Sequence, residues 1–319
     1  MSPYSSAQLL FLSKFKSPKS ADLYANDESW KEVLEEKPTK TVDRFKRDGL
    51  LLETNLEQRI DISFKSTELK EMLKKRGLKQ SGRKEEQIAR LIEYNRAEME
   101  KTVVKVKGYI LSVKGTELAI DYLEREREIR ERAEEQVLDF LKKRDFEKAV
   151  RTMANYESVQ VFPRGMGIDW KRYNPRRDVN QLKYIFSSKP AILKGLDESK
   201  FEVLRLAAGV MLLWGKSRCE EWLLKDFTSG FRLDAETAAR MFLFFGMSKY
   251  ELDFLRESRD FIDGIQISAI EDSCRACKGI HARIFKLNNV IELPYENCTH
   301  EMGCRCTYLP IVKGLSAPL

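Results

Sequence analysis

The chain has 319 residues, of which 42% are hydrophobic and 34% are charged, and its formal net charge is +7. A chain of this length is long for one hydrophobic core, which argues against a single domain and predicts two or more. The longest apolar run near the start covers residues 9–12, far too short for a signal-peptide core or a bilayer-crossing helix, so we expect a cytoplasmic protein without membrane contact.

Residues 1–58 are predicted to form a small helical unit. The segment ESWKEVLEEKP has helical spacing and stops at Pro38, and TVDRFKRDGLLLE is typical of a short helix, a stop at Gly49 and a strand. This order resembles part of a winged-helix unit. Residues 99–155 are expected to contain a strand hairpin, which could complete a strand-bearing module, followed by a charged amphipathic helix.

Residues 59–98 are predicted to form a compact helical hairpin. Ser66 is a candidate cap for the first helix, Gly77 ends it, and the second helix begins near Lys84. The apolar residues at helical spacing that should face inward are Leu69, Met72, Leu73, Ile88, Leu91 and Ile92.

The junction between these two helices is strongly basic. Residues 65–96 carry ten basic and five acidic side chains, and such a local excess is typical of a nucleic-acid contact. The start of the second helix also offers backbone N–H groups to an anion. The basic side chains predicted to form this phosphate-binding corner are Lys74, Lys75, Arg76, Lys79, Arg83 and Lys84.

The stretch STELKEMLKKRGLKQSGRKEEQIARLIEY resembles a SAP domain, a small two-helix DNA-binding module. The resemblance implies duplex DNA as the partner, held through backbone contacts, with Ser81 and the basic residues facing phosphate and Gly82 in the turn between them. A solvated or protein-binding hairpin is the alternative.

Residues 156–198 are expected to be an irregular linker, and residues 199–265 a helical core. The glycine and GKS at 209–217 have the wrong spacing for a phosphate loop, and the residues between them are apolar, which excludes nucleotide binding there. A protein partner could bind the helical middle or the C-terminal module.

Residues 266–319 hold five of the six cysteines and both histidines. Cys-x-x-Cys followed by a second ligand group is typical of a zinc site, and in a reducing compartment such cysteines bind metal rather than form disulfides. The first choice of ligands is Cys274, Cys277, Cys304 and Cys306, with Cys298 or His300 as replacements. Two metal ions, or a reactive Cys–His pair, are alternatives.

The same region also resembles the C-terminal motif of Mu-type phage head-morphogenesis proteins. The residues that match are Asp272, Cys274, Cys277, Gly279, Phe285, His300, Cys304, Arg305, Cys306 and Pro310. The chain departs from the motif in the spacing from His300 to Cys304, in lacking a proline after His300, and in its extra Cys298. This resemblance implies a bacterial or prophage origin.

These observations predict a mainly α, multi-domain chain with a small α+β C-terminal module stabilised by Zn²⁺. The function they favour is a DNA-associated binding protein. The alternatives are a metal-dependent nuclease or hydrolase delivered to DNA, or a phage head-assembly protein. Since no catalytic constellation stands out among the many carboxylates, we lean against an enzyme.

Overall fold

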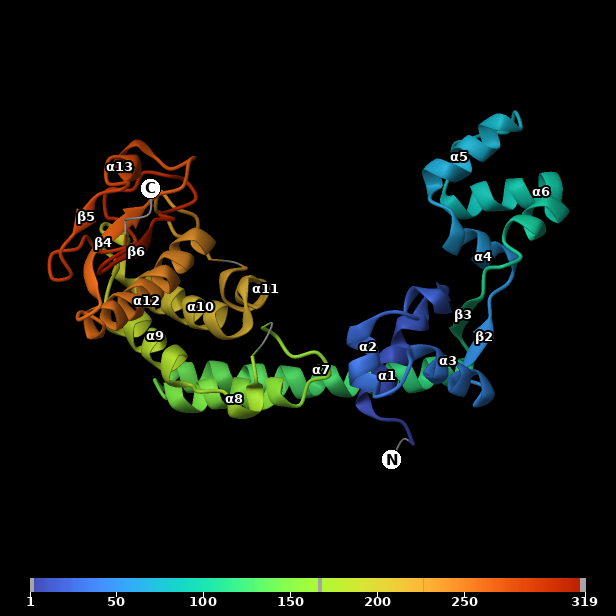
Figure 1. The fold of residues 1–319 in the computed structure, drawn as a ribbon, viewed down its shortest axis with the longest axis horizontal. Helices are drawn as coiled ribbons and strands as arrows, with labels where there is room; N and C mark the ends of the chain where they lie inside the picture. The colour runs from blue at the N-terminus through green and yellow to red at the C-terminus, as the bar shows by residue number, and fades with distance from the viewer. Residues whose placement is uncertain (1–2, 166–167, 226, 316–319) are drawn as a thin grey trace. The chain divides into compact units, whose positions relative to one another are not determined.

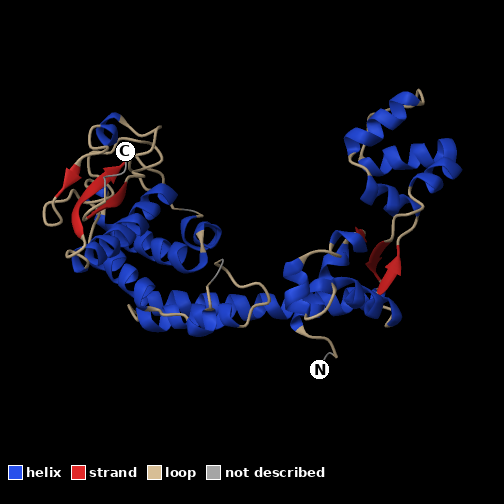
Figure 2. Cartoon of the chain, in the orientation of Figure 1, coloured by secondary structure: helices blue, strands red, loops and turns tan. Residues whose placement is uncertain are grey.

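The computed structural model describes residues 3–165, 168–225 and 227–315. The chain divides into two compact units, residues 1–129 (unit 1) and residues 130–319 (unit 2), and the division falls within the long helix α7 (Val113–Lys142). Helices dominate both units, and each holds a small sheet (Figures 1 and 2). The expected mainly helical fold class is therefore confirmed.

Unit 1 begins with short helices around a three-stranded antiparallel sheet of order β1-β3-β2. Its elements in chain order are α1 (Ser6–Ser13), η1 (Lys14–Lys16), β1 (Lys19–Ser20), η2 (Ala21–Leu23), α2 (Glu28–Leu34), α3 (Pro38–Arg47), β2 (Leu51–Glu53) and β3 (Gly108–Leu111). The core beneath them is rich in aromatic rings, with Phe11, Phe15 and Phe45 fully buried.

Strand β3 joins residues from two distant parts of the chain. It pairs with β1 (Lys19 opposite Tyr109) and with β2 (Leu51 opposite Leu111). The hairpin expected within residues 99–155 is thus a single strand there, whose partners come from residues 1–58. The backbone N–H and C=O groups of a strand can form their hydrogen bonds with a strand that is distant in sequence, so a local pattern does not identify the partner.

Three helices form a module inserted between β2 and β3: α4 (Leu56–Ser63), α5 (Ser66–Lys75) and α6 (Lys84–Thr102) (Figure 1). The module has its own apolar core, in which Leu69, Leu73, Ile88 and Leu91 are buried as the sequence predicts. Ser66 is the first helical residue rather than the cap.

Unit 2 packs helices around a large apolar core. Beyond α7 they are α8 (Phe146–Ser158), η3 (Trp170–Arg172), α9 (Arg176–Ser187), η4 (Ala191–Leu193), η5 (Glu198–Lys200), α10 (Phe201–Trp214), α11 (Lys216–Cys219), η6 (Glu220–Leu224) and α12 (Ala235–Glu257). Helix α9 lies inside the stretch expected to be an irregular linker. Its inner face buries Leu182 and Ile185, because α9 packs against α12.

The C-terminal residues add a second antiparallel sheet of order β5-β4-β6 and one short helix. Their bounds are β4 (Ile262–Ser268), α13 (Arg275–Lys278), β5 (Ile284–Phe285) and β6 (Thr307–Val312). The sheet and the helices of unit 2 share one apolar core, which includes Ile265 and Cys304. Among the described helices, none combines the length and the apolar character that a membrane span needs.

Candidate nucleic-acid interface and cysteine cluster

The loop between α5 and α6 begins with a tight helix stop. Gly77 adopts φ +68°, a left-handed conformation that costs glycine little. The N–H of Gly77 then donates to the carbonyl of Lys74 at 3.1 Å, and the N–H of Leu78 donates to the carbonyl of Leu73 at 2.9 Å. This pair of bonds is a Schellman motif, and it turns the chain sharply away from α5.

Two polar side chains of α6 fix the rest of this loop from the inside. Gln87, which is fully buried, donates through Nε2 to the carbonyls of Gln80 and Gly82 at 3.2 and 3.0 Å. Arg90 donates through Nη1 to the carbonyls of Lys79 and Ser81 at 2.8 and 2.7 Å. Four consecutive carbonyls are thereby held toward α6, so the loop is a defined shape.

Gln87 and Arg90 were not predicted as functional residues. Gln87 also accepts a hydrogen bond from Ser66 Oγ at 3.0 Å, which ties the start of α5 to α6. The sequence offers one signal for the role of Gln87, which is its position directly before the apolar residue Ile88. A polar side chain that is buried beside such a residue needs hydrogen-bond partners.

Six of the eight predicted DNA-contacting residues lie exposed at this end of the module: Lys74, Lys75, Lys79, Ser81, Gly82 and Arg83. Lys74, Lys75 and Lys79 form no ion pair with any residue that the structure describes. Arg83 is 86% exposed and has only a loose contact to Glu86, at 3.7 Å. The module therefore presents a group of cations to solvent.

Arg76 and Lys84 are held by other parts of the module. Arg76 is 17% exposed, donates to the carbonyl of Met72 at 2.8 Å and pairs with the carboxylate of Glu98. Lys84 is 29% exposed, and its Nζ lies 2.7 Å from both the carbonyl and the carboxylate of Asp61. These two cations connect the helices of the module.

The N-terminus of α6 has no side-chain cap from Arg83. Its free N–H groups point along the helix axis toward any bound anion. The first turn carries Glu85 and Glu86, whose charges offset part of the positive end of the helix dipole. Anion binding here would therefore depend on the lysine side chains more than on the helix end.

The family model of the SAP domain matches residues 63–96. This range covers α5, the loop and the first part of α6, so residues 63–96 form a SAP domain. No curated protein and no solved structure matches the chain. The likeness of the C-terminal region to phage head-morphogenesis proteins stays a prediction.

Five cysteines converge near the C-terminal sheet. Their sulfur atoms form two groups of three, Cys274 with Cys277 and Cys298, and Cys277 with Cys304 and Cys306, and within each group all sulfurs lie within 4.8 Å of one another. Cys277 belongs to both groups. The structure thus brings together every cysteine of the predicted set, and the cluster could hold a metal ion.

The geometry of the first group suits a tetrahedral thiolate site. Four sulfurs about 2.3 Å from one ion are separated by roughly 3.8 Å along each edge of the tetrahedron. The sulfurs of Cys274 and Cys298 lie 3.9 Å apart. Backbone donors also point at the sulfurs: the N–H of Thr299 at Cys274 (3.4 Å) and the N–H of Tyr295 at Cys304 (3.2 Å). This donor set fits a soft or borderline cation.

The thiol groups differ in their acidity. Burial alone would raise the pKa of Cys274, but the N–H groups of Cys277 and Thr299 stabilise its thiolate and lower the pKa to about 6. Burial, together with the neighbouring Cys304, raises the pKa of Cys277. The neighbouring Cys304 and burial raise the pKa of Cys298. A cation among these sulfurs would favour their thiolate forms.

His300 lies outside both sulfur groups. Its Nδ1 accepts a hydrogen bond from the N–H of Met302 at 3.0 Å, and its Nε2 lies 2.9 Å from Arg305 Nη2. Arg305 also donates to Asp272 at 2.9 Å. Arg305 thus connects Asp272 and His300 beside the cluster. The other histidine, His281, accepts from the N–H of Ala269 through Nδ1.

Proposed function

We propose that this protein is a DNA-associated binding protein that holds duplex DNA through its SAP domain. The observation that carries the proposal is the group of exposed, unpaired lysines, Lys74, Lys75 and Lys79, around a loop whose shape Gln87 and Arg90 fix. Because the loop backbone is already fixed, only the lysine side chains must become ordered when they contact phosphates. Phosphate contacts give affinity and orientation but no sequence readout, so this contact alone should tolerate any duplex sequence.

The test is the triple variant K74A/K75A/K79A compared with K142A/K183A/K194A, which removes the same charge from exposed lysines of unit 2. Affinity for a random duplex is measured over a range of salt concentrations. Each lost phosphate contact should reduce the slope of log K against log salt by about 0.9. We expect the SAP variant to lose affinity and slope while the control keeps both. Equal behaviour of the two variants would exclude the SAP domain as the DNA contact.

We further propose that the cysteine cluster holds one structural Zn²⁺. Cys274, Cys277 and Cys298 would supply three thiolates, and Cys304 or Cys306 the fourth. A site with all four positions filled by protein leaves no place for an activated water, so this arrangement favours a binding protein over a nuclease or hydrolase. When bound, the ion would cross-link the segment around Cys274 to the segment that precedes β6. Reduced thiols suit the cytoplasm.

A role in phage head assembly rests on the cysteine motif alone. It predicts that the protein co-purifies with capsid shells, which distinguishes it from a free DNA-associated protein.

A further inference from the structure

Helices α2 and α3 follow one another through a three-residue connection, the order found in a helix-turn-helix. Asp27 caps α2 by accepting from the N–H of Trp30 at 3.2 Å. Helix α2 ends at Leu34, and the next residue, Glu35, adopts φ 56°. Residues 35–37 then make the turn, and Pro38 begins α3 with its fixed backbone angle. A turn of about three residues between two helices is typical of this motif, in which the second helix enters a groove of DNA.

The SAP domain stands where this unit would otherwise have a hairpin loop. Strands β2 and β3 pair as the two arms of a hairpin, with Leu52 opposite Ile110 and Glu53 opposite Tyr109. The connection between the arms is residues 54–107, which contain the whole SAP domain. The helix-turn-helix and the SAP domain are therefore parts of unit 1 joined by two chain segments.

The outer face of α3 carries donors and acceptors that could meet base edges. Val42 and Phe45 anchor the helix in the aromatic core. Lys40, Asp43 and Arg47 are exposed on the opposite side. In the major groove, a lysine or arginine pairs with guanine and a carboxylate accepts from cytosine, so this set suits sequence readout. In the proposed function, the lysines of the SAP domain contact phosphates instead.

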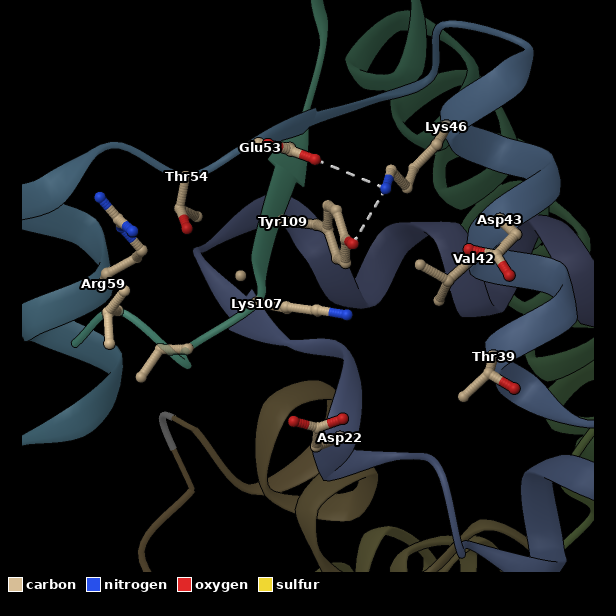
Figure 3. Close-up of a pocket in the computed structure, with 13 residues that line it drawn as sticks. Asp22, Thr39, Val42, Asp43, Lys46, Glu53, Thr54, Arg59, Lys107 and Tyr109 are labelled. Carbon is tan, nitrogen blue, oxygen red and sulfur yellow. Dashed lines mark hydrogen bonds and ion pairs between the residues drawn. The ribbon is translucent and has the colours of Figure 1, made fainter.

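A hollow of about 610 Å³ lies beside α3 (Figure 3). Thr39 and Asp43 line it from α3, Tyr109 lines it from β3, and Lys107 lines it from the residue directly before β3. Lys46 stands between them, donating to Tyr109 Oη at 3.1 Å and pairing with Glu53 at 3.5 Å. Lys107 points into the hollow, whose lining has mixed charge, with three cations and three carboxylates: Lys46, Arg59, Lys107, Asp22, Asp43 and Glu53 (Figure 3).

We infer that α3 is a second DNA contact, which reads base sequence while the SAP domain holds the backbone of the same duplex. The inference rests on the proposed DNA binding and adds to it a source of sequence preference. Two observations carry it: the order of α2 and α3 with the paired strands β2 and β3 after them, and the mixed donor and acceptor set on the exposed face of α3. Duplex DNA is the partner that satisfies both.

The double variant K40A/D43A tests this inference without changing the net charge. Its matched control is E28A/K31A, which removes an exposed ion pair from α2 and also leaves the net charge unchanged. The full chain and both variants are used to select binders from a library of random duplexes, and circular dichroism checks that each is folded. We expect the wild-type chain and the control to enrich a common sequence. We expect K40A/D43A to lose about tenfold in preference for it, with its affinity for random duplex retained.

Enrichment of the same sequence by K40A/D43A would overturn the inference, as would binding by the wild-type chain with no enriched sequence. In both cases the SAP contact survives. Absence of any duplex binding by the wild-type chain would instead remove the proposed function itself, so the two failures are distinguishable.

Discussion

Gln87 determines the shape of the loop that presents the SAP lysines. Its amide makes three hydrogen bonds inside the module, two to loop carbonyls and one from Ser66. A buried polar group that loses its partners is costly, and the same holds for the partners left behind. The shape of the loop should therefore depend more on the uncharged Gln87 than on any one of the lysines.

The variant Q87A should lower the free energy of unfolding of unit 1 by about 1–3 kcal/mol, because Ser66 Oγ and two carbonyls lose a partner. Amide hydrogen exchange should also become faster in residues 79–83. The control Q80A changes an exposed side chain and should alter neither quantity. Unchanged exchange in Q87A would show that Arg90 alone suffices to fix the loop.

Arg76 and Lys84 show that the composition of a basic motif does not indicate which of its cations are free to contact DNA. Both stand in the basic corner that the sequence predicts, yet Glu98 and Asp61 hold them within the module. These carboxylates lie outside the loop, and one of them comes from α4, so only the folded helices reveal the pairing. Replacing Arg76 or Lys84 would combine lost charge with lost stability, which makes them poor probes of DNA binding.

At the scale of elements, the insertion of the SAP domain between β2 and β3 is the main organising feature of unit 1. Thr54 still donates to the carbonyl of Gly108 at 3.0 Å, so the two arms stay paired up to the point where the insertion begins. The aromatic core of Phe11 and Phe45 does not include residues of α5 or α6. The two parts should therefore fold without each other.

Replacing residues 55–107 by Asn-Gly should leave a folded helix-turn-helix unit, because these two residues favour the tight turn of a hairpin. We expect its unfolding midpoint to shift by no more than about 8 °C, which corresponds to roughly 1 kcal/mol in a small domain. Thermal denaturation followed by circular dichroism measures this shift. A shortened chain that is unfolded or aggregated would show that the SAP domain supports the sheet.

The sequence predicts the local parts of this architecture and misses the distant ones. The apolar spacing of Leu69 and Leu73, with Gly77 as a stop, is enough for the SAP hairpin. The pairing of β2 with β3 joins residues on either side of the whole insertion, and no local pattern indicates it. For the same reason, the predicted hairpin in residues 99–155 is a single strand.

At the scale of the whole molecule, the SAP domain and the cysteine cluster lie in different units. The cysteine cluster shares its apolar core with α12 and the C-terminal sheet, whereas the SAP domain belongs to unit 1. The density of cysteines was enough to predict the cluster. The hydrogen bond from the N–H of Cys304 to Met241 Sδ, at 3.3 Å, could not be predicted, because Met241 lies in α12, which is distant in sequence.

Purified protein should contain one zinc per chain, and its removal by a chelator should unfold the region around β4 and β6, because metal binding and folding are coupled. Elemental analysis and hydrogen exchange measure the two effects. C298S should lose the zinc, whereas C219A, which changes a buried cysteine outside the cluster, should keep it. DNA affinity should be unaffected by the chelator, and a parallel loss of DNA binding would contradict the separation of the two units.

The double attachment of the SAP domain has a consequence for how long the protein stays on DNA. A domain on one flexible tether searches a wide volume, whereas a domain held at both ends stays close to its neighbour, and its effective local concentration is correspondingly high. In the proposed complex, the lysines of the SAP domain would keep the duplex nearby when α3 dissociates from its site, until α3 rebinds. Residence time on a long duplex should therefore exceed what either contact alone would give, and a single proteolytic cut in one tether would leave the other in place.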